Sequence, residues 1–257
     1  MPKSNETPLQ RLAFKRLLSR WTKLADEADA LDPHQLRQAG ARARQLQKPL
    51  DEVLHKAEYK LTLPVIGSNA IQAPIGADWS WRPEIWRGPV RPVGAASVPT
   101  KTQIGSEATV FHDCTISELT FRQLRNTRPV DLAPFGLRMD VFGFDGSFLS
   151  LAIDLPAEAT HDLRKRHVIG LDAIVETEKP LDLFARLNIK HGPNTEQVVR
   201  ELPVNNGEAE MEFDIAYTKV NERRVERAWV DLILKEPEMN QVVLRDLTFS
   251  RRLRSEL

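Results

Sequence analysis

Residues 181–190, LDLFARLNIK, contain the clearest strand pattern in the chain. Its apolar residues Leu183, Ala185, Leu187 and Ile189 occupy every second position. Successive side chains of a β-strand point to opposite faces, so this pattern predicts a strand with one buried and one solvated face. A strand of that kind is typical of an antiparallel sheet.

The same period of two continues through residues 107–257, and the run 210–215 alternates as cleanly. Turn signals such as Asp145-Gly146, Gly192-Pro193 and Asn206-Gly207 separate the runs. The candidate strands are 108–113, 116–124, 137–144, 147–155, 167–177, 181–190, 196–201, 209–216, 226–235 and 241–250. Few helical patterns lie between them. We therefore predict a mainly β fold, an antiparallel β-sandwich of jelly-roll type, in residues 107–257.

Residues 1–61 show a helical period instead. Two apolar seams have alternating steps of three and four residues. The first is Phe14, Leu17, Trp21, Leu24, Ala28 and Leu31, and the second is Leu36, Ala39, Ala43, Leu46, Leu50, Val53 and Ala57. The short connection at Asp32-Pro33 predicts an antiparallel α-helical hairpin of coiled-coil type before the sandwich. Pro49 should kink or split the second helix.

The hairpin is also a candidate for self-association. A two-helix hairpin buries one stripe of each helix, and this leaves further leucines at its surface, namely Leu9, Leu12, Leu18, Leu54 and Leu61. Such patches commonly pack against a second copy or another protein. The alternative is a monomer in which the segment that follows covers them.

Residues 62–106 are rich in proline and glycine, which indicates an irregular connector. The segment also contains Trp79, Trp81 and Trp86. Flexible linkers rarely contain tryptophan, so we expect this connector to be docked on the sandwich.

Composition narrows the classes of function. Lysine plus arginine and aspartate plus glutamate number 36 each, so the formal net charge is zero, which argues against a nucleic-acid partner. No apolar run approaches the length of a bilayer span, and the start of the chain lacks a signal-peptide pattern, so we expect no membrane insertion and a cytoplasmic location. With Cys114 as the single cysteine, no internal disulfide can form.

No motif for catalysis, a metal or another cofactor stands out. His112-Asp113-Cys114 places a thiol near an imidazole, but a small buried cysteine at a strand end explains it as well. The six histidines are scattered, and the glycines form no phosphate-binding loop. The sequence therefore assigns no catalytic residue, no metal ligand and no cofactor.

Two groups of residues are candidates for binding. The polar face of the predicted strand at 181–190 carries Asp182, Phe184, Arg186, Asn188 and Lys190. An exposed ring beside amide and guanidinium donors is suited to a glycan, although many sheets simply have one solvated face. Trp79 and Trp81 can form a sugar-stacking platform or, alternatively, a hydrophobic clasp that holds the connector to the sandwich.

Several segments resemble an uncharacterised bacterial family of unknown function over nearly the whole chain. They are DWSWRPEIWRGP at 78–89, TVFHDC at 109–114, FDGSFL at 144–149, NIKHGPNTE at 188–196 and LRDLTFSRR at 244–252. This resemblance implies no activity and no catalytic residue. The β region, in particular its closing run at 229–249, is also similar to galactose-binding-like sandwiches, the fold of many carbohydrate-binding modules. That likeness implies a fold that hosts many functions.

Two hypotheses about function follow. The first is a non-catalytic binding or assembly protein whose sandwich recognises a glycan or a protein ligand. The second is a carbohydrate-active enzyme that uses carboxylates on a sheet face, for example Glu210, Glu212 and Asp214.

Overall fold

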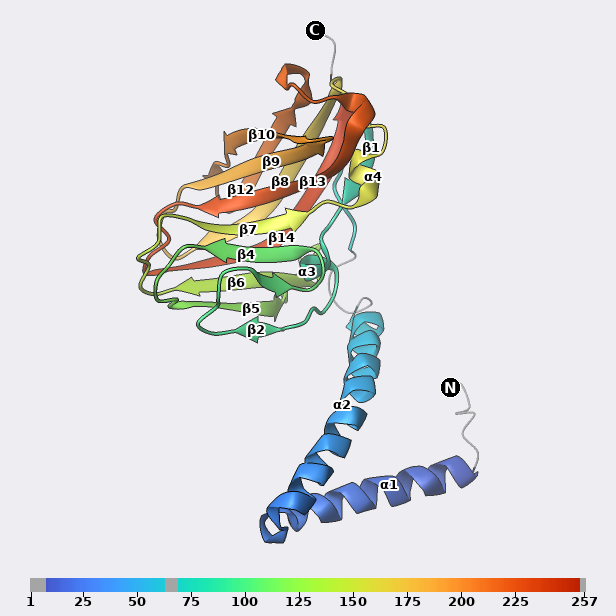
Figure 1. Cartoon of the computed structure of the whole chain (residues 1–257). Coiled ribbons are helices and arrows are strands. Elements are labelled where there is room, and N and C mark those ends of the chain that lie inside the picture. Colours follow the sequence, from blue (N-terminus) through green and yellow to red (C-terminus); the bar gives the residue numbers. More distant parts are fainter. Residues whose placement is uncertain (1–7, 63–68, 255–257) are drawn as a thin grey trace. The chain divides into compact units, whose positions relative to one another are not determined.

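The computed structural model describes residues 8–62 and 69–254 (Figure 1). The chain divides into two units, Met1–Lys56 and Ala57–Leu257. The first unit contains helix α1 (Pro8–Asp26), the short 3-10 helix η1 (Ala28–Ala30) and most of helix α2 (Pro33–Thr62). The Asp32 carboxylate caps α2, because its Oδ1 accepts hydrogen bonds from the backbone N–H groups of His34 and Gln35 at 2.8 and 3.0 Å. Of the two expected effects of Pro49, a kink or a split, the split does not occur, because helix α2 continues through this residue.

The two helices confirm the hairpin, but its apolar seam is open. Partial burial occurs near the connection, at Trp21, Leu24, Leu31 and Ala39. Further along the seam the side chains are exposed, with Phe14 at 64% and Leu50 at 61%. The period of three and four residues determines which face of each helix is apolar. It does not determine how much of that apolar face is buried against other side chains. Of the predicted off-seam leucines, Leu12, Leu18 and Leu54 are exposed, and the side chains of Leu9 and Leu61 lie outside the described part.

The second unit is a sandwich of two antiparallel sheets, as predicted (Figure 1). The eight-stranded sheet has the order β11-β12-β8-β14-β6-β5-β2, and β1 pairs with β14 beside this path. Its strands are β1 (Ala77–Trp81), β2 (Gly94–Ala95), β5 (Leu119–Arg125), β6 (Phe135–Val141), β8 (His167–Thr177), β11 (Val204–Asn205), β12 (Glu208–Asp214) and β14 (Asn240–Leu253).

The six-stranded sheet has the order β10-β9-β13-β7-β4-β3. Its strands are β3 (Thr102–Ile104), β4 (Ala108–His112), β7 (Leu149–Asp154), β9 (Leu183–His191), β10 (Asn194–Glu201) and β13 (Val225–Leu234). Short helical turns lie in the connections between strands, namely α3 (Glu84–Arg87) between β1 and β2, α4 (Ala157–Thr160) between β7 and β8, and both η2 (Ile215–Tyr217) and η3 (Glu222–Arg224) between β12 and β13.

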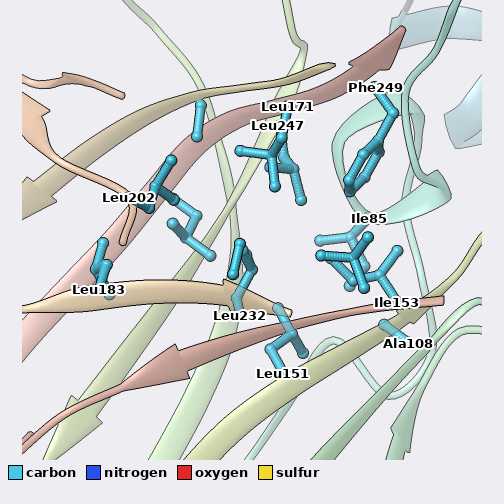
Figure 2. Packing of buried hydrophobic residues seen from close by; sticks show 14 of the residues in the cluster. Ile85, Ala108, Leu151, Ile153, Leu171, Leu183, Leu202, Leu232, Leu247 and Phe249 are labelled. Atoms are coloured by element: carbon cyan, nitrogen blue, oxygen red, sulfur yellow. The ribbon is translucent and has the colours of Figure 1, made fainter. Parts of the chain in front are cut away.

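The core lies between the two sheets. Leu151, Leu183 and Leu232 of the six-stranded sheet point toward Leu171 and Leu247 of the eight-stranded sheet (Figure 2). All are at most 4% exposed. The inward residues of β9 are those expected from the alternation in residues 181–190, so its other face is turned away from the core.

The segment 62–106 differs from a connector, because its described part contributes to both sheets. Strands β1 and β2 extend the eight-stranded sheet, and β3 is an edge strand of the six-stranded sheet. Trp86 on α3 is fully buried and donates a hydrogen bond from Nε1 to the Leu244 carbonyl at 2.9 Å. Arg82 forms a buried ion pair with Asp246, with Nε 2.8 Å from Oδ1. The ladders of the sandwich therefore begin at Ala77 and include strands that precede residue 107.

Candidate functional site

The outer face of the six-stranded sheet is hollowed. The hollow has a volume of about 470 Å³ and crosses β10, β9, β13, β7 and β4. It is lined by Thr109, Phe111, Phe148, Ser150, Ala152, Asp154, Arg186, Asn188, Gln197, Arg227, Trp229 and Asp231. We call this surface the sheet hollow.

Strand register brings these residues together from distant parts of the chain. Trp229 on β13 lies opposite Asn188 on β9 and opposite Asp154 on β7. One step along the same face, Asp231 lies opposite Arg186. Because alternate residues of a strand share a face, the alternation that buries Val230 and Leu232 turns Trp229 and Asp231 into the hollow.

A buried carboxylate organises the polar part of the sheet hollow. Asp231 is 5% exposed, and its Oδ2 accepts hydrogen bonds from Arg186 Nε at 2.9 Å and from Asn188 Nδ2 at 2.8 Å. Asn188, fully buried, accepts in turn from Gln197 Nε2 at 2.9 Å. Charged groups in such networks form the stronger hydrogen bonds, so the orientations of Arg186 and Asn188 are fixed before any ligand arrives.

Aromatic side chains provide the apolar part. Trp229 is half-buried, and the Arg227 guanidinium lies over its ring at 4.8 Å from the centroid. Phe148 is 42% exposed, and Phe111 is half-buried. Rings beside fixed polar donors and acceptors are the usual composition of a small-molecule or sugar site.

The predicted binding residues of the strand at 181–190 do not all lie in the sheet hollow. Arg186 and Asn188 line the sheet hollow. Lys190 instead forms an ion pair with Glu226 at 3.3 Å, and Asp182, which precedes β9, forms one with Lys235 at 3.7 Å. Phe184 lies on the same face as Arg186, half-buried opposite Ile233.

Trp79 and Trp81 lie on β1, which belongs to the other sheet. Their rings stack with centroids 6.3 Å apart, and the ring centroid of Trp81 lies 5.9 Å from that of the core residue Phe249. Both are partly buried against the core. The structure thus places them apart from Arg186 and Asn188, in an arrangement that holds β1 to the sandwich.

The acidic residues of the enzyme hypothesis lie on the other sheet. Glu212 is paired with Arg252 at 2.8 Å, and Asp214 caps η2 through the backbone N–H of Ala216. Glu210 lies opposite Asp172 in the ladder between β12 and β8. Burial, with Glu210 and Glu212 as further causes, raises the pKa of Asp172 to about 6.

The sequence His112-Asp113-Cys114 does not form a reactive pair. His112 Nε2 lies 2.8 Å from the Val98 carbonyl, and its Nδ1 accepts from the backbone N–H of Cys114. Asp113 accepts hydrogen bonds from Ser147. Burial raises the pKa of the Cys114 thiol, which disfavours the nucleophilic thiolate. Within residues 8–62 and 69–254 no group of three histidine, cysteine or acidic residues is arranged to hold a metal.

Sequence reasoning missed Trp229, Asp231, Gln197, Phe111 and Phe148. The alternation within 226–235 places Trp229 and Asp231 on a common face, and this signal was available. Nothing in the sequence, however, shows that this face adjoins Arg186 and Asn188, because pairing between β9 and β13 joins residues about forty positions apart.

None of the described helices is both long and apolar enough to cross a bilayer.

Comparisons with known proteins give structures of low similarity. The enzymatically active domain of tailspike protein 4 from bacteriophage CBA120 has a TM-score of 0.40 at 10% identity, with 56% of this chain and 19% of that chain covered. The family 11 carbohydrate-binding module from Clostridium thermocellum, solved with a β-1,3-1,4-mixed-linked tetrasaccharide, has a TM-score of 0.39 at 10% identity. That alignment covers 61% of this chain and 96% of the module.

The CBM22-1 xylan-binding domain from Paenibacillus barcinonensis Xyn10C has a TM-score of 0.35 at 12% identity, with 64% and 94% covered. This chain thus spans about a fifth of the tailspike domain and nearly all of either module. Likeness at these TM-scores carries no argument about function. No curated protein matches the chain. A family model matches residues 1–257 throughout, and the chain therefore belongs to DUF6478, a family of unknown function.

Proposed function

We propose that the sheet hollow binds an oligosaccharide without cleaving it. The observation that carries this proposal is the network in which buried Asp231 fixes Arg186 and Asn188 beside Trp229. A sugar offers hydroxyl groups around its edge and an apolar C–H surface on its face. The network holds the Arg186 guanidinium, whose side chain is 36% exposed, as an oriented donor, and the rings of Trp229 and Phe148 offer apolar contact area.

The shape supports a chain of sugars as the ligand. The hollow crosses five adjacent strands, which corresponds to about 19 Å at the usual strand spacing. On β4, β7, β9 and β13 its residues occupy alternate positions, and β10 contributes Gln197, so contacts are distributed along the length of the hollow. Affinity should therefore increase with oligosaccharide length until the hollow is filled.

The charges in the hollow favour binding over hydrolysis. A glycosidase uses one carboxylic acid as a proton donor and a second carboxylate as base or nucleophile. The acidic residues that line the hollow are Asp154 and Asp231. Asp231 is 5% exposed and its Oδ2 accepts hydrogen bonds from Arg186 and Asn188, so this carboxylate is not free to contact a glycosidic bond.

The second candidate, a carbohydrate-active enzyme, has its support on the other sheet. Asp172, Glu210 and Asp246 line a hollow of about 250 Å³ together with Arg82 and Thr248. A carboxyl group with a pKa of about 6 is suited to general acid catalysis. This candidate predicts the release of reducing ends from a bound glycan and the loss of that release in Asp172→Asn.

A glycan array tests the proposal. The full chain is labelled and applied to a printed array of neutral and acidic oligosaccharides, together with Phe148→Ala and Phe142→Ala. Both phenylalanines are exposed, at 42% and 51%, but only Phe148 lines the hollow. We expect wild type and Phe142→Ala to bind the same oligosaccharides and Phe148→Ala to lose signal. No binding by wild type, or equal loss in both variants, would contradict a site in the hollow.

A further inference from the structure

Helix α1 carries an apolar face that the described structure leaves open. Phe14, Leu17, Leu18 and Trp21 have the spacing i, i+3, i+4, i+7, which places them on one side of the helix. Phe14 is 64% exposed, Leu18 is 56% exposed and Leu17 is 46% exposed. Trp21, nearer to the connection with α2, is half-buried. The end of α1 distant from the connection therefore presents large apolar side chains to solvent.

Basic residues flank this face on both sides. Arg16, Arg20 and Lys23 follow one edge at spacings of four and three residues, and Lys15 lies beyond the other edge. The single acidic residue within Pro8–Asp26 is Asp26 at the end of the helix. The helix is thus both amphipathic and strongly cationic, although the whole chain has a net charge of zero.

A basic groove adjoins the same helix. It has a volume of about 800 Å³, lies between α1 and α2, and is lined by Lys15, Arg16, Arg20, Lys23 and Arg42, with Glu27 as its acidic member. Lys23 is paired with Glu27 at 3.7 Å, and both side chains are more than half exposed. Among the described residues that line this groove, basic side chains therefore outnumber acidic ones by five to one.

The charges that flank the apolar face of α1 favour an anionic partner over a second copy of the helix. A second copy of α1 would bring cations against cations along both edges of the apolar face, whereas helices that pair with themselves usually place opposite charges at those edges. An anionic occupant has no such conflict. Apolar Phe, Trp and Leu with flanking Lys and Arg are the composition of a helix that lies in the plane of a lipid interface.

We propose that α1 docks on an anionic lipid surface. In this arrangement Phe14, Leu17 and Leu18 enter the boundary between headgroups and acyl chains, and Arg16, Arg20 and Lys23 contact the anionic headgroups. The helix lies on the surface and does not cross it, in agreement with its length and composition. This binding is independent of the sheet hollow and of any glycan.

Vesicle co-flotation of the full chain tests the proposal. The probes are vesicles of phosphatidylcholine alone and vesicles that contain phosphatidylglycerol as well. We expect binding to the anionic vesicles only, and weaker binding as salt increases. Phe14→Gln with Leu18→Gln should reduce the partition coefficient at least about tenfold. Arg16→Gln with Arg20→Gln should reduce it about thirtyfold at low salt, because each cation near such a surface contributes about a factor of five.

Matched controls come from α2. Leu50→Gln with Val53→Gln removes apolar side chains of similar exposure, at 61% and 65%, and Arg37→Gln with Arg44→Gln removes the same number of charges. Both controls should retain binding, and circular dichroism confirms that helix content is unchanged in every variant. The proposal is overturned if wild type fails to float with anionic vesicles at low salt, or if α1 and α2 variants lose binding equally. A wild-type dimer that Phe14→Gln with Leu18→Gln dissociates, without lipid binding, would assign the face to a second copy instead.

Discussion

Asn188 Nδ2 on β9 lies 2.8 Å from Asp231 Oδ2 on the neighbouring strand β13. The two residues are diagonal neighbours, because Asn188 pairs with Trp229 and Asp231 pairs with Arg186. The Asn188 side chain is fully buried and Asp231 is 5% exposed, although both stand on the face of the sheet that points away from the core. A buried amide and a buried carboxylate stabilise each other only while both are present. The sheet hollow is thus built on a polar network that the strands shield from water.

Replacement of Asp231 by alanine should destabilise the protein and abolish glycan binding. Arg186 and Asn188 would each lose an acceptor, and we expect a loss of about 2–3 kcal/mol in the free energy of unfolding. Urea denaturation of the second unit measures this. Asp182→Ala is the control, because its ion pair with Lys235 is exposed and should contribute less than about 1 kcal/mol.

The double variant Arg186→Met with Asp231→Leu separates stability from binding. It removes the charge pair as a unit, so much of the stability lost in Asp231→Ala should return while binding stays absent. Equal stability of Asp231→Ala and wild type would show that the network does not contribute to the fold.

Asp172 predicts a dependence of stability on pH. Its pKa rises from 3.8 in the unfolded chain to about 6 in the folded one, so the folded state favours the protonated form. The resulting stability is present in full below about pH 4 and is lost as the pH rises through about 6. Asp172→Asn avoids that loss. Near pH 8 we expect its free energy of unfolding to be about 1 kcal/mol higher than that of wild type, after allowance for solvent screening.

Thermal unfolding near pH 4 and near pH 8 measures this difference. Glu178→Gln, at an exposed position, is the control and should change little at either pH. A stabilisation by Asp172→Asn that is as large near pH 4 as near pH 8 would contradict the assignment to titration of Asp172.

The described part of residues 62–106 should be indispensable to the sandwich. Arg82 pairs with Asp246, and Trp86 is buried against Leu244, so a chain that begins at residue 107 would leave a buried acid without its partner and a core cavity. We expect residues 69–257 to unfold cooperatively by calorimetry and residues 107–257 to show no cooperative transition. Cooperative unfolding of the shorter chain would show that this segment is merely docked.

Cys114 should react slowly. Burial raises the pKa of its thiol, so little thiolate is present near neutral pH. Labelling of the native protein by a thiol reagent should be much slower than labelling in urea, and Cys114→Ser should reduce stability by about 1 kcal/mol. Native labelling as fast as that of the unfolded chain would indicate an accessible, reactive thiol.

The sequence predicted the sandwich because alternation within a strand is a local property. Leu183, Ala185, Leu187 and Ile189 are all buried in β9, as the pattern of residues 181–190 required. The short strand β1 was missed because ADWSW lies in a proline-rich segment and reads as irregular. Its strand structure depends on pairing with β14, which is a tertiary contact that local propensity does not encode.

The candidate site was less accessible to sequence analysis for the same reason. Arg186 and Asn188 were recognisable as residues on the polar face of a strand. Their partners Asp231 and Gln197 lie on neighbouring strands, and the registers that bring them within 3 Å are determined by the assembled sheet. In the helical hairpin the apolar face of each helix was predicted correctly, but most side chains of that face are exposed in the structure.

Isothermal titration of one array-positive oligosaccharide measures whether the sheet hollow is the glycan site. Wild type and Phe142→Ala should bind with equal affinity, and Phe148→Ala should bind at least about fivefold more weakly, since an aromatic contact in a sugar site contributes about 1 kcal/mol or more. All three proteins should have the same melting temperature to within a few degrees, because both phenylalanines are exposed. Equal affinity of Phe148→Ala and wild type, with the fold intact, would contradict the assignment of the sheet hollow as the glycan site.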